Sequence, residues 1–195
     1  MLKKDKLLAI FRKSHALQRG HFELSSGLHS GHYFQCAQVL QDPRLASQIC
    51  AEIARRFKKS KPTVIIGPAV GGTIVAYETA RHMKTRAMYT ERVDSEMQLR
   101  RGFVLTKQDR VLVVEDAITT GESARKVADL VEALSAKVIG VAAIVDRSGG
   151  KVKFPGRRYE RLLTISCETF HPNDCPLCSE QIPVTRPGRP KRNMV

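Results

Sequence analysis

Two adjacent acidic residues, Glu115 and Asp116, stand between an apolar run at residues 111–114 and a turn rich in hydroxyl groups. Carboxylates at the end of a buried strand are costly to remove from water without partners, so we expect this pair to face a cleft that holds hydroxyls or a cation. The turn that follows supplies small and hydroxylated residues at the start of an expected helix, namely Thr119, Thr120, Gly121 and Ser123. Because hydroxyls and N–H groups at a helix N-terminus favour a phosphate, the spacing predicts a sugar-phosphate site. The carboxylates would bind the ribose hydroxyls and the turn would bind the 5-phosphate.

A second turn, at residues 67–72, has the sequence Gly-Pro-Ala-Val-Gly-Gly and follows an apolar run at 63–66. Its glycines would let backbone N–H groups approach a phosphate closely. It is neither a P-loop, because no Gly-Lys-Ser/Thr follows, nor the spaced triple-glycine dinucleotide motif. A tight structural turn explains it as well as a binding loop does. For the first turn, at residues 119–123, the alternative without a ligand is an ordinary capped helix start. That alternative explains the hydroxyl groups but not the acidic pair, Glu115 and Asp116.

The five cysteines do not indicate a disulfide framework, because cytosolic thiols are normally kept reduced. Cys36 and Cys50 lie in apolar stretches and are interpreted as small buried hydrophobic residues. A separate pattern, C-x3-H-x3-C-x2-C, contains four potential ligands of a tetrahedral zinc site, Cys167, His171, Cys175 and Cys178. Its spacing is not that of a standard zinc finger or ribbon, so reduced thiols without a metal are the alternative.

The composition is that of one globular domain with an anionic partner. The chain has 195 residues, of which 42% are hydrophobic and 27% charged, and 33 Lys and Arg against 19 Asp and Glu give a net charge of +14. Aromatic residues make up only 6%, Trp is absent and the basic residues are scattered, which favours a small polyphosphate over nucleic acid. No apolar run approaches the roughly 20 residues of a membrane span, and no secretory signal is recognisable. We therefore expect a cytoplasmic protein, with a solvated basic tail at residues 186–192.

Strands and helices are predicted to alternate through the middle of the chain. Apolar runs predict strands at residues 63–66, 86–90, 111–114 and 137–145, and helical periodicity predicts helices at 73–82 and 124–134. Before them we expect a helix within residues 2–17, two short strands within 20–36, and a helix that Asp42 caps and Pro43 begins. This pattern is typical of a parallel α/β sheet covered on both faces. Ligands of such sheets bind at the carboxyl ends of the strands, where both turns would meet.

Residues 111–123 resemble the phosphoribosyl pyrophosphate (PRPP) signature of type I phosphoribosyltransferases, and the surrounding residues resemble the orotate phosphoribosyltransferases. The resemblance extends from about Gly20 to Arg147. It includes the stretch 22–27 followed by Tyr33-Phe34, the turn at 67–72, Glu91-Arg92 and Asp146-Arg147. It implies the type I phosphoribosyltransferase fold, a central mostly parallel sheet flanked by helices, with a small N-terminal hood. Residues 1–60 would form the N-terminal helix and hood, 61–170 the PRPP-binding core, and 171–195 a C-terminal CPLC segment and basic tail.

The resemblance also implies roles for individual residues. Glu115, Asp116 and Arg92 would be catalytic. PRPP would be bound by these three residues and by Ala117, Ile118, Thr119, Thr120, Gly121, Glu122, Ser123, Ala69, Val70 and Gly71, with a non-proline cis peptide expected at Ala69-Val70. Orotate would be bound by Thr119, Arg147, Tyr33 and Phe34. Mg²⁺ would be required, held largely by PRPP without a direct protein ligand.

The implied reaction transfers the phosphoribosyl group from PRPP to orotate and gives orotidine 5-phosphate and pyrophosphate, a step of pyrimidine biosynthesis. A flap at residues 91–103 would close over the site, and the protein would form a homodimer. The sequence departs from the best-known bacterial pattern at three places. Ser25 stands where that pattern has a lysine, and Val70-Gly71 stands where it has Tyr-Lys. The flap also lacks the Lys-rich, His-containing run of that pattern. Two alternatives remain: a phosphoribosyltransferase for a purine base, and a PRPP-sensing regulator that binds nucleic acid on the same fold.

Overall fold

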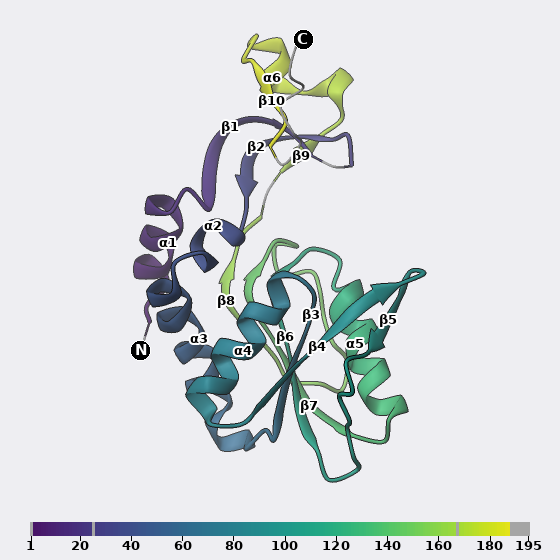
Figure 1. Ribbon diagram of the computed structural model, residues 1–195. Helices are drawn as coiled ribbons and strands as arrows, with labels where there is room; N and C mark the ends of the chain where they lie inside the picture. Colours follow the sequence, from purple (N-terminus) through teal and green to yellow (C-terminus); the bar gives the residue numbers. More distant parts are fainter. Residues whose placement is uncertain (1, 25, 167, 188–195) are drawn as a thin grey trace, which may run out of the picture.

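The computed structural model describes residues 2–24, 26–166 and 168–187, and its main feature is a six-stranded sheet (Figure 1). The strand order is β5-β4-β3-β6-β7-β8. All neighbouring strands are parallel except β5, which pairs antiparallel to β4. The strands are β3 (Val64–Pro68), β4 (Arg86–Val93), β5 (Glu96–Leu99), β6 (Arg110–Ile118), β7 (Lys137–Asp146) and β8 (Tyr159–Thr164). The expected mostly parallel sheet is confirmed, with β8 as an additional strand at its edge.

Side chains alternate along the strands and build a hydrophobic core on each face of the sheet. In β3, Ile65 packs into one core, whereas Val64 and Ile66 pack into the other. The first core is completed by α1 (Lys4–Lys13), α2 (Ala37–Leu40), α3 (Pro43–Phe57) and α4 (Gly71–Met83), and the second by α5 (Glu122–Ala133). Both faces of the sheet are therefore covered, which explains why its central strands are apolar throughout.

The start of α3 follows the capping chemistry that the sequence predicts. Asp42 accepts a hydrogen bond from the backbone N–H of Arg44 at 2.9 Å, and Pro43 occupies the first turn. Ile49, Ile53 and Phe57 are completely or almost completely buried along one stripe of this helix. The helix therefore packs against the six-stranded sheet, as its periodicity indicates.

A second sheet of four strands, here called the small sheet, lies above the main one in Figure 1 and has the order β10-β1-β2-β9. Its antiparallel hairpin consists of β1 (Leu17–Glu23) and β2 (His29–Phe34). The outer strands are β9 (Thr169–Phe170), antiparallel to β2, and β10 (Val184–Thr185), parallel to β1. Short turns at η2 (Pro172–Asp174) and α6 (Pro176–Ser179) connect them, and η1 (Lys58–Ser60) follows α3. The small sheet thus joins the first part of the chain to its C-terminal segment. The division of the chain into a hood at residues 1–60, a core at 61–170 and a C-terminal segment at 171–195 stays a prediction.

The acidic pair lies within strand β6, which is longer than the strand expected at residues 111–114. Glu115 pairs in register with Ala143, and Ile118 pairs with Asp146. The longer β7 strand continues the ladder beyond the apolar run, so β6 ends at Ile118, and the hydroxyl-rich turn at residues 119–123 leads into the first turn of α5. Among the described residues, no helix is both long and apolar enough to cross a membrane.

Candidate active site

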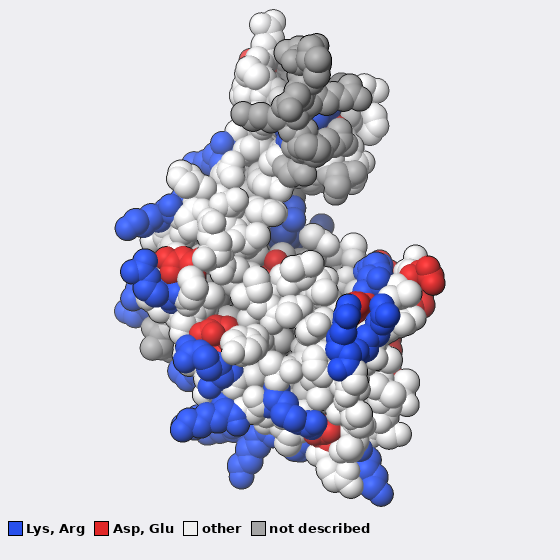
Figure 2. Space-filling model, viewed as in Figure 1, with Lys and Arg blue, Asp and Glu red and all other residues white. Residues whose placement is uncertain are grey.

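The predicted site residues meet at the carboxyl edge of the main sheet, where β3, β6 and β7 end. These strands are neighbours and parallel, so the loops that follow them share one edge. The surface is indented between this edge and the small sheet (Figure 2). A small pocket at the edge is lined by Glu115 and by residues 117–124. The structure therefore brings the acidic pair and the hydroxyl-rich turn to one place.

Glu115 is a buried carboxyl with an unusual protonation state. Only 8% of the residue is exposed, and burial raises its pKa to about 9, with further contributions from the negative charge of Asp116 and a hydrogen bond to its side chain. At neutral pH the ligand-free protein therefore holds Glu115 in its protonated form. A protonated carboxyl can both donate and accept a hydrogen bond, which suits a vicinal diol.

Asp116 lies against the first turn of α4, and Gly71 makes this possible. A Cβ atom at Gly71 would be 2.5 Å from Cγ of Asp116, so any other residue would displace the carboxylate. At Gly72, a Cβ atom would be 3.3 Å from Oε1 of Glu115. The glycines of the second turn therefore accommodate both carboxyl groups, and the two turns form one site.

The backbone of the loop between β3 and α4 has the conformation that the resemblance implies. The Ala69-Val70 peptide bond is cis, as predicted. The N–H of Ala69 donates to the carbonyl of Thr90 at 2.8 Å, and the Val70 side chain is 79% exposed. The loop thus lies between the end of β3 and β4, next to the N-terminus of α4.

The hydroxyl-rich turn is fixed by contacts of its backbone. Gly121 has a φ of 79°, which glycine adopts readily, and it caps the N-terminus of α5. Arg125 donates to the carbonyl of Thr120 at 2.7 Å, and the hydroxyl of Thr120 accepts from the N–H of Glu122 at 3.3 Å. Thr119 and Thr120 are exposed. The turn therefore presents hydroxyls and a helix N-terminus to an approaching anion.

Arg92 reaches this turn from β4. Its guanidinium donates to the hydroxyl of Ser123 at 3.2 Å. Residues 91–103, the expected flap, contain the end of β4 and an antiparallel hairpin with β5, whose turn residues Asp94 and Ser95 both have positive φ. Glu91 at its base pairs with Arg101 at 2.7 Å and with Arg100 at 3.5 Å, and the hydrogen bond from Arg101 lowers the pKa of Glu91.

Arg147 follows β7 and carries a buried donor without a partner. The backbone N–H of Arg147 donates to the carbonyl of Ile118 at 2.7 Å, which ties this residue to the end of β6. Within the described part of the chain, the buried Nε of its guanidinium has no hydrogen-bond partner. Asp146 is completely buried and accepts from the N–H of Ser148 at 2.8 Å. Because an unsatisfied buried donor is costly, the guanidinium is suited to an anionic ligand.

Tyr33 and Phe34 do not both line a pocket, which corrects that expectation. The Phe34 ring is 3% exposed and packs against Phe11 in the hydrophobic core, with 4.9 Å between ring centroids. Successive side chains of a strand point to opposite faces, so Tyr33 points away from this core. Its ring packs against Phe22 at 5.6 Å, and its hydroxyl donates to the side-chain oxygen of Gln35 at 3.2 Å.

Cys36 is a residue of the site that sequence reasoning did not place there. Its predicted burial is confirmed, but its thiol donates to the backbone carbonyl of Asp116 at 3.4 Å. Burial raises the pKa of this thiol, and the negative charge of Asp116 raises it further. No local pattern indicates this contact, because 80 residues separate the two partners.

The predicted zinc ligands are only partly brought together. Cys175 and Cys178 lie beside His21 and His29 of the small sheet. His171 is not a member of this group, because its side chain instead accepts from the N–H of Asn173 at the start of η2. Cys167 lies outside the described residues, as do Ser25 and the tail from residue 188 onward. The sequence pattern therefore identified two of the four residues that the fold assembles.

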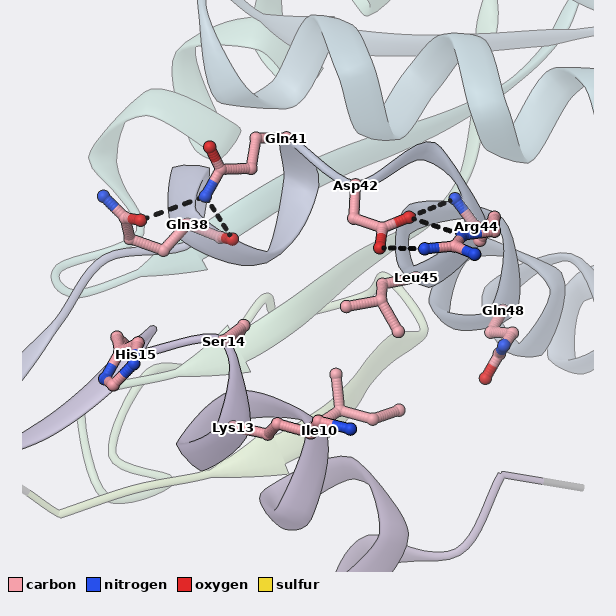
Figure 3. Close-up of a pocket in the computed structure, with 10 residues that line it drawn as sticks. All are labelled: Ile10, Lys13, Ser14, His15, Gln38, Gln41, Asp42, Arg44, Leu45 and Gln48. Carbon is pink, nitrogen blue, oxygen red and sulfur yellow. Dashed lines mark hydrogen bonds and ion pairs between the residues drawn. The ribbon is translucent and has the colours of Figure 1, made fainter.

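A further pocket lies where α1, α2 and the start of α3 meet (Figure 3). Its polar side chains are bonded locally, with Asp42 to Arg44 and Gln38 to Gln41. It lies between helices rather than at the carboxyl edge of the sheet, and no predicted site residue lines it. We therefore assign the candidate active site to the sheet edge.

Comparison with known proteins agrees with this geometry. Residues 37–160 match the phosphoribosyl transferase domain family. A protein of Caldicellulosiruptor bescii is 48% identical over 191 residues, which cover 98% of this chain and all of the relative. A protein of Carboxydothermus hydrogenoformans is 48% identical over 187 residues, 95% of this chain and 97% of the relative. The chain belongs to the phosphoribosyltransferase family. Both of these relatives are orotate phosphoribosyltransferases.

Solved structures show the same fold. Orotate phosphoribosyltransferase of Mycobacterium tuberculosis superposes with a TM-score of 0.68 at 24% identity, over 83% of this chain and 95% of that one. The enzyme of Aeropyrum pernix superposes with a TM-score of 0.66 at 26% identity, over 81% of this chain and 93% of that one. The M. tuberculosis enzyme has also been solved in complex with PRPP.

Proposed function

We propose that this protein is an orotate phosphoribosyltransferase, which transfers the 5-phosphoribosyl group of PRPP to orotate in pyrimidine biosynthesis. The observation that carries the proposal is the position of Glu115 and Asp116. They lie between the glycines of one turn and the hydroxyls of the other, in a chain that matches orotate phosphoribosyltransferases over nearly its whole length. A ribose with an anionic group at each end fits this arrangement.

In the proposed complex, PRPP spans the two turns. The 5-phosphate binds the turn at residues 119–123, at the N-terminus of α5. The ribose hydroxyls bind Glu115 and Asp116, and the diphosphate binds the loop at 69–71 and Arg92. Arg92 already lies at the edge of this site, where its guanidinium donates to the hydroxyl of Ser123.

Orotate is assigned to the space beside Arg147. This residue presents a buried guanidinium N–H without a partner among the described residues, and a carboxylate is its strongest complement. Purine bases carry no carboxylate, so Arg147 is the feature that separates orotate from the purine alternative. Thr119 follows β6 and Arg147 follows β7, and these neighbouring strands bring both residues to the same edge.

Catalysis follows from the charges of the site. Loss of pyrophosphate leaves a cationic, oxocarbenium-like ribose, which Asp116 stabilises by its negative charge while Arg92 stabilises the departing anion. A ring nitrogen of orotate then forms a bond to this anomeric carbon, and the proton of that nitrogen is released to solvent or to the departing pyrophosphate. Because the cation reacts with water, closure of the hairpin at residues 91–103 would protect it.

Mg²⁺ fits the chemistry of the site, since the carboxylate of Asp116 and the ribose hydroxyls that would lie beside it offer the hard oxygen atoms that this ion prefers. When bound with PRPP it would neutralise part of the charge on the leaving group. We propose that the diphosphate holds most of the ion. A homodimer and a cytoplasmic location remain proposals from the family resemblance.

The test is incubation of the full chain with PRPP, Mg²⁺ and orotate, followed by loss of orotate absorbance and detection of orotidine 5-phosphate. Adenine, guanine, hypoxanthine and uracil are offered in parallel. The proposal predicts turnover of orotate alone. Consumption of a purine base without orotate would overturn the substrate assignment.

The regulator alternative predicts a different outcome, namely PRPP binding without turnover of any base. On the face shown in Figure 2, Lys and Arg side chains are spread over many elements and mingled with acidic residues. A continuous basic stripe, which nucleic-acid binding favours, is not visible on this face.

A further inference from the structure

Four side chains of metal-binding type converge outside the candidate active site. They are His21 from β1, His29 from β2, and Cys175 and Cys178 from the segment after β9. One ligand atom from each lies within 4.8 Å of the others. His21 is 2% exposed, His29 is 7% exposed and Cys175 is 1% exposed. Two imidazoles and two thiols are one of the donor sets of structural zinc sites.

Three of the distances between these atoms are close to the edges of a zinc tetrahedron. Sγ of Cys175 lies 3.5 Å from Nε2 of His21, and Sγ of Cys178 lies 3.8 Å from the same nitrogen and 3.3 Å from Nδ1 of His29. Bonds of about 2.3 Å to sulfur and 2.0–2.1 Å to nitrogen give edges of roughly 3.3–3.8 Å. The two nitrogens, 2.8 Å apart, are the closest pair and would separate slightly around an ion.

The orientation of His21 supports the same conclusion. Its other ring nitrogen, Nδ1, lies 2.7 Å from the backbone carbonyl of Ile182. This carbonyl can only accept, so Nδ1 carries the proton and Nε2 offers its lone pair to the centre of the cluster. Zinc-binding histidines are commonly oriented by such a bond to a backbone carbonyl.

The segment that carries the two cysteines has almost no hydrophobic core of its own. Within residues 171–187, all of which the structure describes, Cys175 is the only buried residue. The pairing of β10 with β1 covers two residues, His21 with Val184 and Phe22 with Thr185. Such a segment buries too little apolar surface to offset the entropy of ordering its backbone. Metal coordination is one way in which small units without a core are stabilised.

We propose that His21, His29, Cys175 and Cys178 bind one Zn²⁺, which fastens the C-terminal segment to the hairpin of the small sheet. All four positions of the tetrahedron are filled by protein atoms, so the site is structural and offers no open position to a substrate. It replaces the set Cys167, His171, Cys175 and Cys178 that the sequence pattern predicts. This inference is independent of the proposed transferase activity.

The first test is the metal content of the full chain, purified without chelator and dialysed into metal-free buffer. The proposal predicts about one zinc per chain. After removal of zinc with a chelator, addition of Co²⁺ should give thiolate charge-transfer absorption and the visible bands of a tetrahedral complex. Wild-type protein that retains no zinc after loading with zinc chloride, or whose cobalt spectrum is octahedral, would overturn the proposal.

Matched variants distinguish the two ligand sets. Cys178→Ser and His29→Ala should each lower the zinc content at least tenfold, whereas His171→Ala and Cys167→Ser should leave it unchanged. Cys178→His supplies a nitrogen ligand in place of the sulfur and should retain the metal even if Cys178→Ser fails to fold. Loss of zinc in His171→Ala with retention in His29→Ala would refute the assignment.

A hydrogen-exchange measurement on the wild-type protein tests the structural role without any substitution. Chelation should increase exchange of the amides in residues 177–185, whose hydrogen bonds include that from Ile182 to the carbonyl of Leu177. Amides of β6 should be unaffected, because this strand lies in the main sheet. Equal exchange in residues 177–185 with and without zinc would contradict the proposed role.

Discussion

The thiol of Cys36 donates a hydrogen bond to the backbone carbonyl of Asp116, with 3.4 Å between sulfur and oxygen. Cys36 is the N-cap residue of α2, two residues after the small-sheet hairpin ends, whereas Asp116 belongs to β6, a central strand of the main sheet. The contact therefore joins the start of α2 to the strand that carries the two carboxyl residues of the candidate active site.

Cys36→Ala removes this hydrogen bond and is expected to lower kcat severalfold, because the backbone that carries Asp116 loses a partner. Stability should fall by about 1–2 kcal/mol from the lost bond and the small cavity. Cys50→Ala is the matched control, since Cys50 is completely buried in the same hydrophobic core but does not contact Asp116. It should show a similar loss of stability with unchanged kcat. Equal kcat values for the two variants would mean that the Cys36 contact is only structural.

Replacement of the two acidic residues should have unequal effects. Asp116→Asn removes the charge opposite the developing cation and should lower kcat by about tenfold or more. Glu115→Gln should cost less at neutral pH, because a neutral amide replaces a carboxyl that burial already keeps protonated. Steady-state rates at saturating PRPP and orotate measure both. A rate for Asp116→Asn within twofold of wild type would show that the carboxylate has no role in catalysis.

The raised pKa of Glu115 makes the stability of the ligand-free protein depend on pH. The pKa of a solvated glutamate is 4.5, and burial raises that of Glu115 to about 9. The folded state therefore binds more protons than the unfolded state between these values, so this residue's contribution to stability is complete below the lower value. It declines by about 1.4 kcal/mol per pH unit as pH rises and is lost above the upper value.

Glu115→Gln should remove this contribution. The free energy of unfolding of the wild type, minus that of the variant, should therefore decrease as pH rises from 5 to about 9. Chemical denaturation at several pH values measures the difference. A difference that stays constant over this range would show that Glu115 titrates normally.

Gly71→Ala places a methyl group 2.5 Å from Cγ of Asp116. The clash should displace the carboxylate or the first turn of α4, at a cost of about 1–3 kcal/mol in stability and a large loss of kcat. Gly31→Ala is the control, because its methyl group would meet its nearest neighbour, Leu177, at an ordinary 3.9 Å. Wild-type activity in Gly71→Ala would mean that the ligand-free position of Asp116 is irrelevant to turnover.

The central strands and the site turns could be predicted because their signals are local. Apolar runs identify β3 and β7, and the acidic pair with its hydroxyl-rich turn identifies the edge where ligands bind. Strand β8 was not predicted, because it is an edge strand and contains polar residues that resemble those of a loop. One of them, Glu160, instead forms an ion pair with Arg56 of α3.

Contacts between distant segments could not be predicted in this way. The sequence groups Cys175 and Cys178 with their nearest neighbours of metal-binding type, whereas the fold brings them to His21 and His29 across about 150 residues. The prediction that Phe34 binds orotate was wrong for a related reason. Which side of β2 faces the core depends on the packing of α1, which supplies Phe11.

The most direct test is a crystal structure of the full chain soaked with PRPP and Mg²⁺. We expect the ribose hydroxyls to lie within hydrogen-bond distance of Glu115 and Asp116, with the 5-phosphate in the turn at residues 119–123. A ribose bound elsewhere, or bound in reverse with its 5-phosphate at residues 69–71, would contradict this account.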